Sequence, residues 1–232
     1  RWLGGKYAIK AVGKNHLSAW ERAQAHGTIA LPKPNPYIPT YLTLVKHTEK
    51  ASATPHPVEI ANSDHGEVYF WGDTEYKVPE VSWTLSFKSP LLDGTARSTV
   101  LNALYVHAVE EKLVPTLSEA SRGGLSAAIS SGTLKTTLHI NGYSEKAGDL
   151  LSAVVDEMKH VNTSEKSFDV YKESLLSQYN DQAKSLPFSQ ALELVGHTLF
   201  SHSPLQSQLA SALNNITYND FTTFSENVFS SA

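Results

Sequence analysis

Five residues near the middle of the chain have the chemical types, and almost the spacing, of a hydrolytic zinc site. They read His107-Ala-Val-Glu110-Glu111. In an H-x-x-E-H segment the two histidines share one face of a helix and hold Zn²⁺, while the glutamate polarises a metal-bound water. Here Glu111 stands where the second histidine is required, and no nearby Cys or His replaces the lost imidazole. One histidine and two glutamates also suit an ordinary solvated helix face, so these residues alone do not define a site.

Other residues that could carry chemistry lack the spacing that it requires. His197 and His202 lie five positions apart, which misses the i, i+3 or i, i+4 spacing of a single helix face. The sequence contains no G-x-S-x-G segment, and Gly123-Gly124 is not followed by a phosphate-binding pattern. We therefore predict no catalytic residue in the chain and no complete metal site.

The composition is that of an ordinary globular protein. Hydrophobic residues make up 41% of its 232 residues and charged residues 18%. A formal charge of −4 gives no basic surface, so we expect neither a nucleic acid nor an anionic membrane as partner. No apolar run reaches the roughly 18 residues that a membrane span requires. The lack of cysteine excludes a disulfide framework and fits the cytoplasm and a bacterial periplasm equally well.

An N-terminal tail precedes the main body of the chain. It starts at Arg1 without an initiator methionine, which leads us to expect a piece of a longer polypeptide. A short helix is predicted over residues 14–26. Residues 31–39 carry four prolines, which exclude a helix or a central strand and favour a docking strap or a stiff spacer. Residues 40–65 show no clear core face and are predicted to be a linker laid over a surface.

The main body, from residue 66 onward, has the pattern of a packed α+β domain. Residues 81–88 alternate between apolar and polar, which is the period of a half-buried antiparallel strand. Thr95 or Ser98 then caps a long helix that Pro115 kinks or ends. Strands are predicted at 67–71, 81–88, 125–130 and 134–140, and helices at 98–114, 150–158, 164–184, 187–201 and 205–229.

Two short signals complete the predicted topology. Asn141-Gly142 predicts a turn between the last strand and the helix that follows it. A break near Asn214-Asn215 divides the last helical segment. The predicted fold class is α+β, with a mostly antiparallel sheet and helices packed on one face.

Several longer phrases occur in an order that carries a family resemblance. They are LPKPNPYIPT, an aromatic strand ending in YFW, KVPEVSWTLSFKSP, ALYVHAVEEKL, GGLS and INGYSEK. Together they resemble the middle, or third, domain of insulinase- and pitrilysin-type zinc metallopeptidases, the M16 family. The resemblance implies four homologous α+β domains arranged as two bowl-shaped halves joined by a linker. In that family only the first domain carries the zinc site, and the later domains keep the fold and wall a chamber that encloses peptides.

The resemblance also implies how the chain is divided. Residues 1–39 would be the end of the preceding domain with its proline-rich strap. Residues 40–65 would be the interdomain linker, around which the two halves pivot. Residues 66–232 would be an M16-like non-catalytic domain that lacks its last strand.

The incomplete zinc motif acquires a meaning from this resemblance. His107 and Glu110 would be relics of the zinc helix, and Glu111 would occupy the place of the second histidine. The family also needs a downstream glutamate as third ligand. Glu173 and Glu193 are candidates, but nothing around either of them marks it as a ligand. We therefore expect no zinc in this chain and place the zinc of the parent protein in its catalytic domain.

The resemblance implies an inactive domain within an active peptidase. Such a domain would form chamber wall and pack against other domains of the same chain, and its peptide substrates would pass Gly124, Leu125 and Ser126. An ordinary sheet edge is the alternative for these three residues. Two other functions stay open: a stand-alone peptide-binding or core-type subunit with this fold, and an atypical metalloenzyme that uses the histidine and two glutamates of the incomplete motif.

Overall fold

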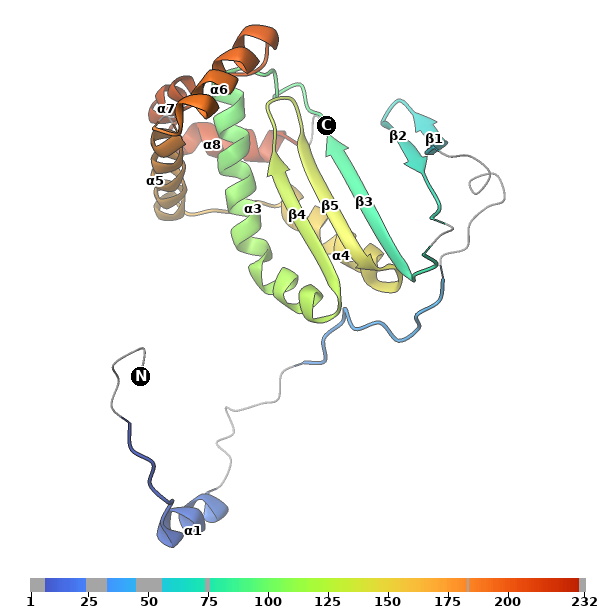
Figure 1. The fold of residues 1–232 in the computed structure, drawn as a ribbon, viewed down its shortest axis with the longest axis vertical. Helices are drawn as coiled ribbons and strands as arrows, with labels where there is room; N and C mark the ends of the chain where they lie inside the picture. The colour runs from blue at the N-terminus through green and yellow to red at the C-terminus, as the bar shows by residue number, and fades with distance from the viewer. Residues whose placement is uncertain (1–6, 24–32, 45–55, 74–75, 183, 230–232) are drawn as a thin grey trace. The chain divides into compact units, whose positions relative to one another are not determined.

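The computed structural model describes residues 7–23, 33–44, 56–73, 76–182 and 184–229. It divides into two compact units, Arg1–Pro34 and Asn35–Ala232. In the first unit, α1 (Lys14–Arg22) buries none of its residues. The helix predicted over residues 14–26 is thus confirmed as far as Arg22, whereas Ala23 is extended and residues 24–26 lie outside the described ranges. Figure 1 shows the order of the elements along the chain.

The second unit is built on a three-stranded antiparallel sheet. Its strands are β3 (Glu80–Phe87), β4 (Leu125–Ser131) and β5 (Thr136–Tyr143), in the order β3-β5-β4. Along each strand the residues of one face are mostly buried or half-buried and those of the other face are mostly exposed, with the hydrophobic side chains of β3 half-buried. The strands predicted at 81–88, 125–130 and 134–140 are confirmed.

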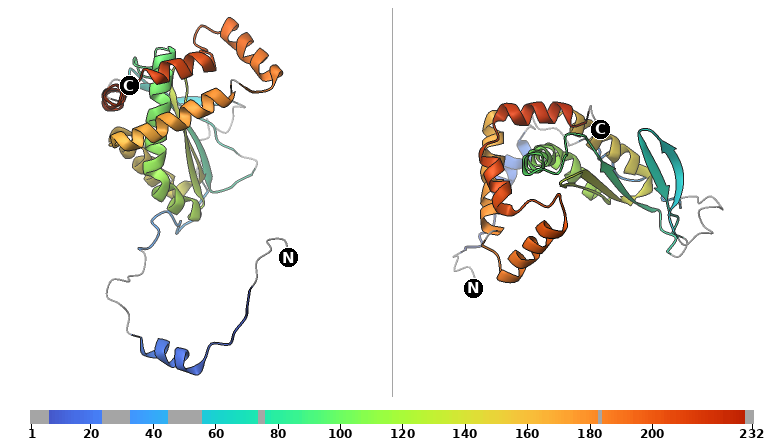
Figure 2. Two further views of the ribbon diagram at one scale, coloured as in Figure 1. Left: turned by 90° about the vertical axis from the view of Figure 1, so that its left-hand side faces the viewer. Right: turned by 90° about the horizontal axis from the view of Figure 1, so that it is seen from above.

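Helices cover the apolar face of this sheet. They are α3 (Ala96–Arg122), which packs beside β4, and α4 (Ser144–Lys159), which lies behind β5 in Figure 1. Three further helices, α5 (Glu165–Gln182), α7 (Gln206–Asn214) and α8 (Tyr218–Asn227), form an arc around α3, as the right-hand view of Figure 2 shows. The predicted fold class, an antiparallel sheet with helices on one face, is confirmed.

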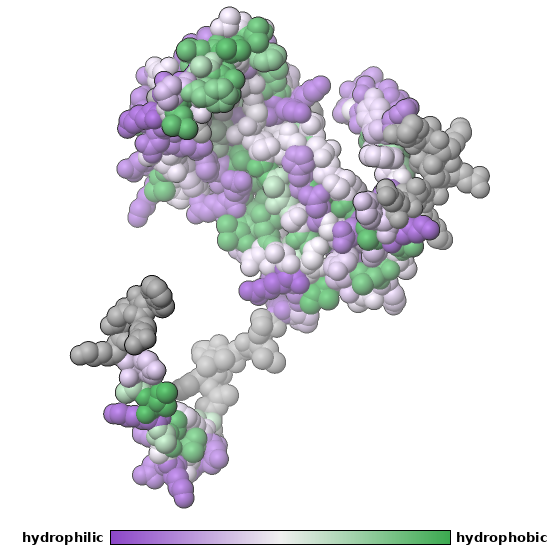
Figure 3. Space-filling model, viewed as in Figure 1, coloured by the Kyte–Doolittle hydropathy of each residue, from purple (hydrophilic) through white to green (hydrophobic). Residues whose placement is uncertain are grey.

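The helix α6 (Pro187–Leu199) differs from the other helices of the second unit because it buries none of its residues. Pro187 occupies its first turn, where the missing amide costs no hydrogen bond. Figure 3 shows hydrophobic residues gathered at the place of α6 in Figure 1. Within the described part of the chain, no helix combines the length and the apolar character that a membrane span requires.

A two-stranded hairpin occupies part of the segment that we predicted to be a linker. It consists of β1 (Val58–Ser63) and β2 (Gly66–Phe70). The strand predicted at 67–71 is confirmed, but β1 was not expected. A shift of register between Glu59 and Ala61 interrupts the alternation of this short strand, and five of its six residues are exposed. The sequence therefore offered neither a period of two nor an apolar face.

The predicted end of the long helix before Pro115 is wrong. Thr95 caps the helix as expected, but α3 continues through Pro115 to Arg122. Proline removes only one amide donor, whereas Ala120 in the last turns is fully buried in the core. Packing of this last part therefore outweighs the local cost of the proline.

The predicted turn at Asn141-Gly142 is also wrong. Both residues lie inside β5 and pair with β3 and β4, and the chain enters α4 directly at Ser144. Gly142 has a φ of 126°, and a Cβ there would lie 2.1 Å from the carbonyl oxygen of Gly124. The glycine is needed because two strands approach each other closely here. In the sequence, the same Asn-Gly pair looks like the signal for a hairpin turn.

Candidate functional site

The start of α3 fixes the helix that carries the incomplete zinc motif. Thr95 Oγ1 accepts a hydrogen bond from the amide of Ser98 at 3.2 Å, and Asp93 accepts from the amide and hydroxyl of Thr95. Hydrogen bonds from Ser98 and Thr95 lower the pKa of Asp93 to about 2. Leu104 and Ala108 are fully buried, which sets the rotation of the helix about its axis. The motif therefore lies toward its outer side.

The side chains of the incomplete motif contact α5. His107 Nδ1 lies 3.9 Å from Glu110 Oε2, and these side chains are 39% and 47% exposed. The ring of His107 stacks on that of Tyr171, with centroids 6.4 Å apart and planes 16° from parallel. The hydroxyl of Tyr171 also donates a hydrogen bond to Glu111. Sequence reasoning missed Tyr171 because it lies sixty positions from Glu111.

These residues do not fit a catalytic zinc ion. Such an ion takes three protein ligands and a water, and of the H-x-x-E-H pattern only His107 and Glu110 have the required residue types. Of the two candidate third ligands, Glu193 accepts a hydrogen bond at 2.6 Å from the amide of Gln206, at the start of α7. Among the described residues, no three or more His, Cys, Asp or Glu side chains come together as a metal-binding group.

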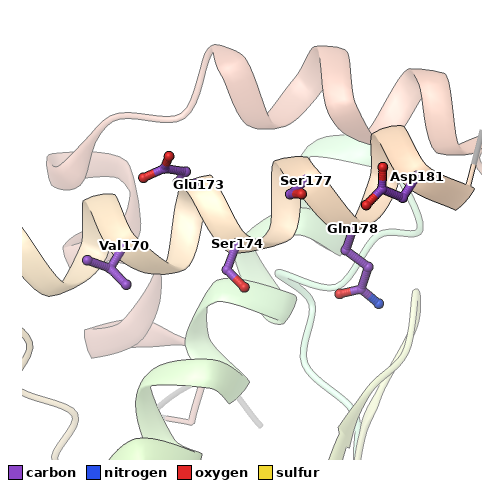
Figure 4. Close-up of a pocket in the computed structure, with 6 residues that line it drawn as sticks. All are labelled: Val170, Glu173, Ser174, Ser177, Gln178 and Asp181. Carbon is purple, nitrogen blue, oxygen red and sulfur yellow. The ribbon is translucent and has the colours of Figure 1, made fainter.

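The other candidate ligand, Glu173, lies in a shallow groove along α5. All six lining residues belong to this one helix: Val170, Glu173, Ser174, Ser177, Gln178 and Asp181. Figure 4 shows their side chains spread along the helix and pointing in different directions. Since no other element that the structure describes lines this groove, it has the character of an ordinary exposed helix surface.

The second candidate region is the face of the central sheet that the helices leave open, which Figure 1 views from the front. Nine residues in three register rows make up this open face. The rows are Ser82, Asn141 and Ser126; Thr84, His139 and Ala128; and Ser86, Thr137 and Ser130. Eight of the nine are classed as exposed, Thr137 being half-buried, and none is Asp, Glu, Lys or Arg. The middle of the open face is therefore polar and uncharged, while charged groups lie at its two ends. Glu80 pairs with Tyr143 in the next row, and at the other end Lys135 Nζ donates a hydrogen bond to Ser86 at 3.4 Å.

Hydrogen bonds connect the strands across this open face. Ser82 donates to Asn141 Oδ1 at 2.6 Å, and Thr84 Oγ1 lies 3.0 Å from His139 Nδ1. Hydroxyl, amide and imidazole groups can each donate or accept toward a peptide laid over the sheet. An antiparallel sheet with one solvated face has the same pattern without any ligand.

The structure separates the three residues predicted to contact substrate. Gly124 adopts a φ of 79°, and a Cβ there would lie 2.5 Å from the ring of Tyr143. Leu125 is only 2% exposed, and its side chain belongs to the core. Ser126 is exposed on the open face, opposite Asn141. Of the three, only Ser126 presents a side chain to the open face.

The end of the proline-rich strap and the two residues after it are hydrogen-bonded to helices of the second unit, to which they belong. Asn35 Nδ2 donates to the carbonyl of Glu119 at 2.7 Å. Glu145, in the first turn of α4, accepts from the amides of Thr40 and Tyr41 at 2.9 and 2.6 Å and from the hydroxyl of Thr40 at 2.7 Å. These bonds, first that of the Tyr41 amide, lower the pKa of Glu145. Glu145 thus anchors a segment more than a hundred positions away in the chain.

Comparison with known proteins decides the family. The model of the middle or third domain of peptidase M16 matches residues 1–212. The chain belongs to this M16 family. Human insulin-degrading enzyme is 23% identical over 216 residues, which cover 93% of this chain and 21% of that enzyme. Human nardilysin is 24% identical over 180 residues, which cover 77% of this chain and 16% of nardilysin.

The fold of this M16 domain agrees with that of a solved relative. The crystal structure of pitrilysin superposes with a TM-score of 0.76 and 22% identity, over 86% of this chain and 21% of that one. The resemblance deduced from the sequence phrases is therefore confirmed. The chain spans about a fifth of the length of the insulin-degrading enzymes that it matches.

Proposed function

We propose that this M16 domain is a non-catalytic part of a larger zinc metalloendopeptidase that degrades peptides. The observation that carries the proposal is the hydrogen bond from Tyr171 to Glu111. It holds the carboxylate that replaces the second histidine ligand against a neighbouring helix, α5. A family member with this replacement fits a structural role better than a hydrolytic one, because no residue that the structure describes takes over the missing ligand.

Zinc chemistry then belongs to another domain of the parent protein. When bound there, zinc would supply an activated water for hydrolysis of the peptide bond. The residues of this chain would not take part in that step. Their role is to enclose the substrate and to hold neighbouring domains in place.

The open face of the sheet is the surface that we assign to the chamber wall. Hydroxyl and amide groups along Ser82, Asn141 and Ser126 can exchange hydrogen bonds with a peptide backbone, whatever its side chains. Of the candidate contacts, Ser126 would act through its side chain, and Gly124 and Leu125 through their backbone only. A polar wall with no charged residue in its three central rows suits an enzyme that encloses many different peptides.

We further propose that the chain is organised as residues 1–39 from a preceding domain, a linker at 40–65 and the M16 domain at 66–232. The hydrogen bonds of Asn35, Thr40 and Tyr41 would fix residues 35–41 to the M16 domain, so that they move together with it. A pivot between two halves of the parent would therefore lie outside residues 35–41.

Elemental analysis together with a cleavage assay tests the proposal. The purified chain should contain far less than one zinc per molecule, and should not cleave a quenched fluorogenic peptide with added Zn²⁺. Stoichiometric zinc that is lost in His107→Ala, with chelator-sensitive cleavage that is lost in Glu110→Gln, would instead establish a metalloenzyme and overturn the assignment.

A further inference from the structure

We propose that an apolar stripe on α6 is a docking surface for another domain of the same parent polypeptide. The stripe consists of Phe188, Leu192, Val195 and Leu199, at positions i, i+4, i+7 and i+11 of the helix. This spacing places all four side chains on one face. Their exposed fractions are 72%, 54%, 51% and 69%. The inference rests on the proposed function, since it needs further domains in the parent.

Two contacts on the other side of α6 attach it to its own chain. The carboxylate of Glu193 accepts from the amide of Gln206 at 2.6 Å, and His197 Nδ1 lies 2.7 Å from the carbonyl oxygen of Ser203. Both residues lie roughly opposite the stripe on a helical wheel. These bonds fix the rotation of α6, so the stripe is turned away from the chain segment that holds the helix. Figure 3 shows the hydrophobic surface that results.

An exposed stripe made only of hydrophobic side chains is typical of a permanent interface. Burial of apolar surface is the main favourable term in protein association. Scattered exposed hydrophobic residues are normal on a protein surface, but a contiguous row on one helix marks an interaction site. The stripe contains no charged residue, and permanent interfaces are more apolar than transient ones.

The size of the stripe argues for a tethered partner rather than a second copy of this chain. A 13-residue helix is only about 20 Å long, and at a width of about 10 Å its face offers roughly 200 Å². A stable complex of separate chains needs about 800 Å² from each partner. A domain of the same polypeptide is held at high effective concentration, so a small contact suffices. The insulin-degrading enzymes that the chain matches are about five times its length, which leaves room for such a domain.

A single cysteine can report whether the stripe is covered. The chain has no cysteine of its own, so Leu192→Cys introduces one thiol on the stripe. Ser189→Cys is the matched control, because it adds a thiol to an exposed position of the same helix outside the stripe. Maleimide labelling is followed by mass spectrometry of the peptide that contains this site, both in the 232-residue chain and in the full-length protein that carries it.

The expected result is that the thiol at position 192 reacts freely in the 232-residue chain and at least tenfold more slowly in the full-length protein. The control thiol at position 189 should react alike in both. Equal labelling at position 192 in both proteins would overturn the proposal. If labelling at position 192 slowed as the concentration of the isolated chain rose, the partner would be a second copy of the chain, which would overturn the proposal. If labelling in the full-length protein slowed equally at positions 189 and 192, no particular face would be covered, which would also overturn it.

A second variant keeps the test independent of the labelling chemistry. Leu192→Gln with Val195→Gln should leave the melting temperature of the isolated chain unchanged, because both side chains are already exposed. In the full-length protein the same pair should increase hydrogen exchange across α6, and unchanged exchange would refute docking. Neither labelling nor hydrogen exchange depends on zinc or cleavage. The docking proposal and the proposal of an inactive zinc motif can therefore be refuted independently.

Discussion

Tyr171 of α5 donates a hydrogen bond to Glu111 of α3 and stacks its ring on His107, one turn earlier in the same helix. A single tyrosine thus engages two of the three residues that match a zinc motif in type or position. The contact ties α5 to α3 through the two positions at which a zinc peptidase with this motif has its metal-binding histidines. It converts the remnant of a catalytic helix into a packing surface.

Restoring the motif should not restore an enzyme. Glu111→His completes H-x-x-E-H, and we expect it to bind zinc at least tenfold more tightly than the parent chain, through His107. The third ligand would still be missing, so peptide cleavage should not appear. Zinc titration calorimetry and a fluorogenic peptide assay measure the two effects. His107→Ala in the Glu111→His background should abolish the gain in affinity, and its persistence would place the metal elsewhere.

The buried hydroxyl of Tyr105 should contribute measurably to stability. It donates to the carbonyl of Met158, in the last turn of α4, where carbonyl groups lack partners within the helix. Tyr105→Phe leaves this carbonyl unsatisfied and should lower the free energy of unfolding by about 1–2 kcal/mol in urea titrations. Tyr69→Phe is the control, because its hydroxyl bonds to exposed glutamates, and it should change stability by less than about 0.5 kcal/mol.

Two glycines should respond to alanine in opposite directions. Gly142→Ala places a Cβ 2.1 Å from the Gly124 carbonyl oxygen at a φ of 126°, and should cost about 3 kcal/mol or more. Gly148 lies within α4 with no atom within 4 Å of an added Cβ. Gly148→Ala should therefore stabilise the chain by about 1 kcal/mol. Chemical denaturation of both variants tests the pair, and a neutral Gly142→Ala would show that β4 and β5 are not this close.

The strap should loosen in acid. Because the pKa of Glu145 is lowered in the folded chain, its ionised form contributes stability that is complete above the ordinary pKa of 4.5. That stability is lost as pH falls through the lowered folded value. Limited proteolysis near Thr40 should therefore accelerate toward low pH with an acid-tolerant protease. Glu145→Gln should give fast cleavage at neutral pH already, with a smaller pH dependence, and an unchanged profile would contradict the anchoring role.

The sequence predicted elements whose signals are local and failed where distant contacts decide. The alternation along β3 and the cap at Thr95 are complete within a few residues, and both were found. The bulge between Glu59 and Ala61 hides the period of β1, and Pro115 marks a helix end that packing of Ala120 overrides. Asn141-Gly142 has the composition of a turn, yet glycine is required at position 142 because the Gly124 backbone approaches it closely.

The candidate site shows the same division. His107, Glu110 and Glu111 could be recognised because their spacing on one helix is fixed by local geometry. Their partner Tyr171 could not, since the approach of α5 to α3 follows from the packing of the whole domain. Ser126 was singled out together with Leu125, and only burial separates the residue on the open face from the one in the core.

The open face of the sheet carries no carboxylate, ammonium or guanidinium group among its nine residues. A peptide held there would be retained by hydrogen bonds and by displaced water rather than by fixed charge. Dissolved salt screens charges but leaves such bonds nearly unchanged. Residence of a peptide over these rows would then depend little on ionic strength, and any salt sensitivity of this wall would come from its ends, where Glu80 and Lys135 lie.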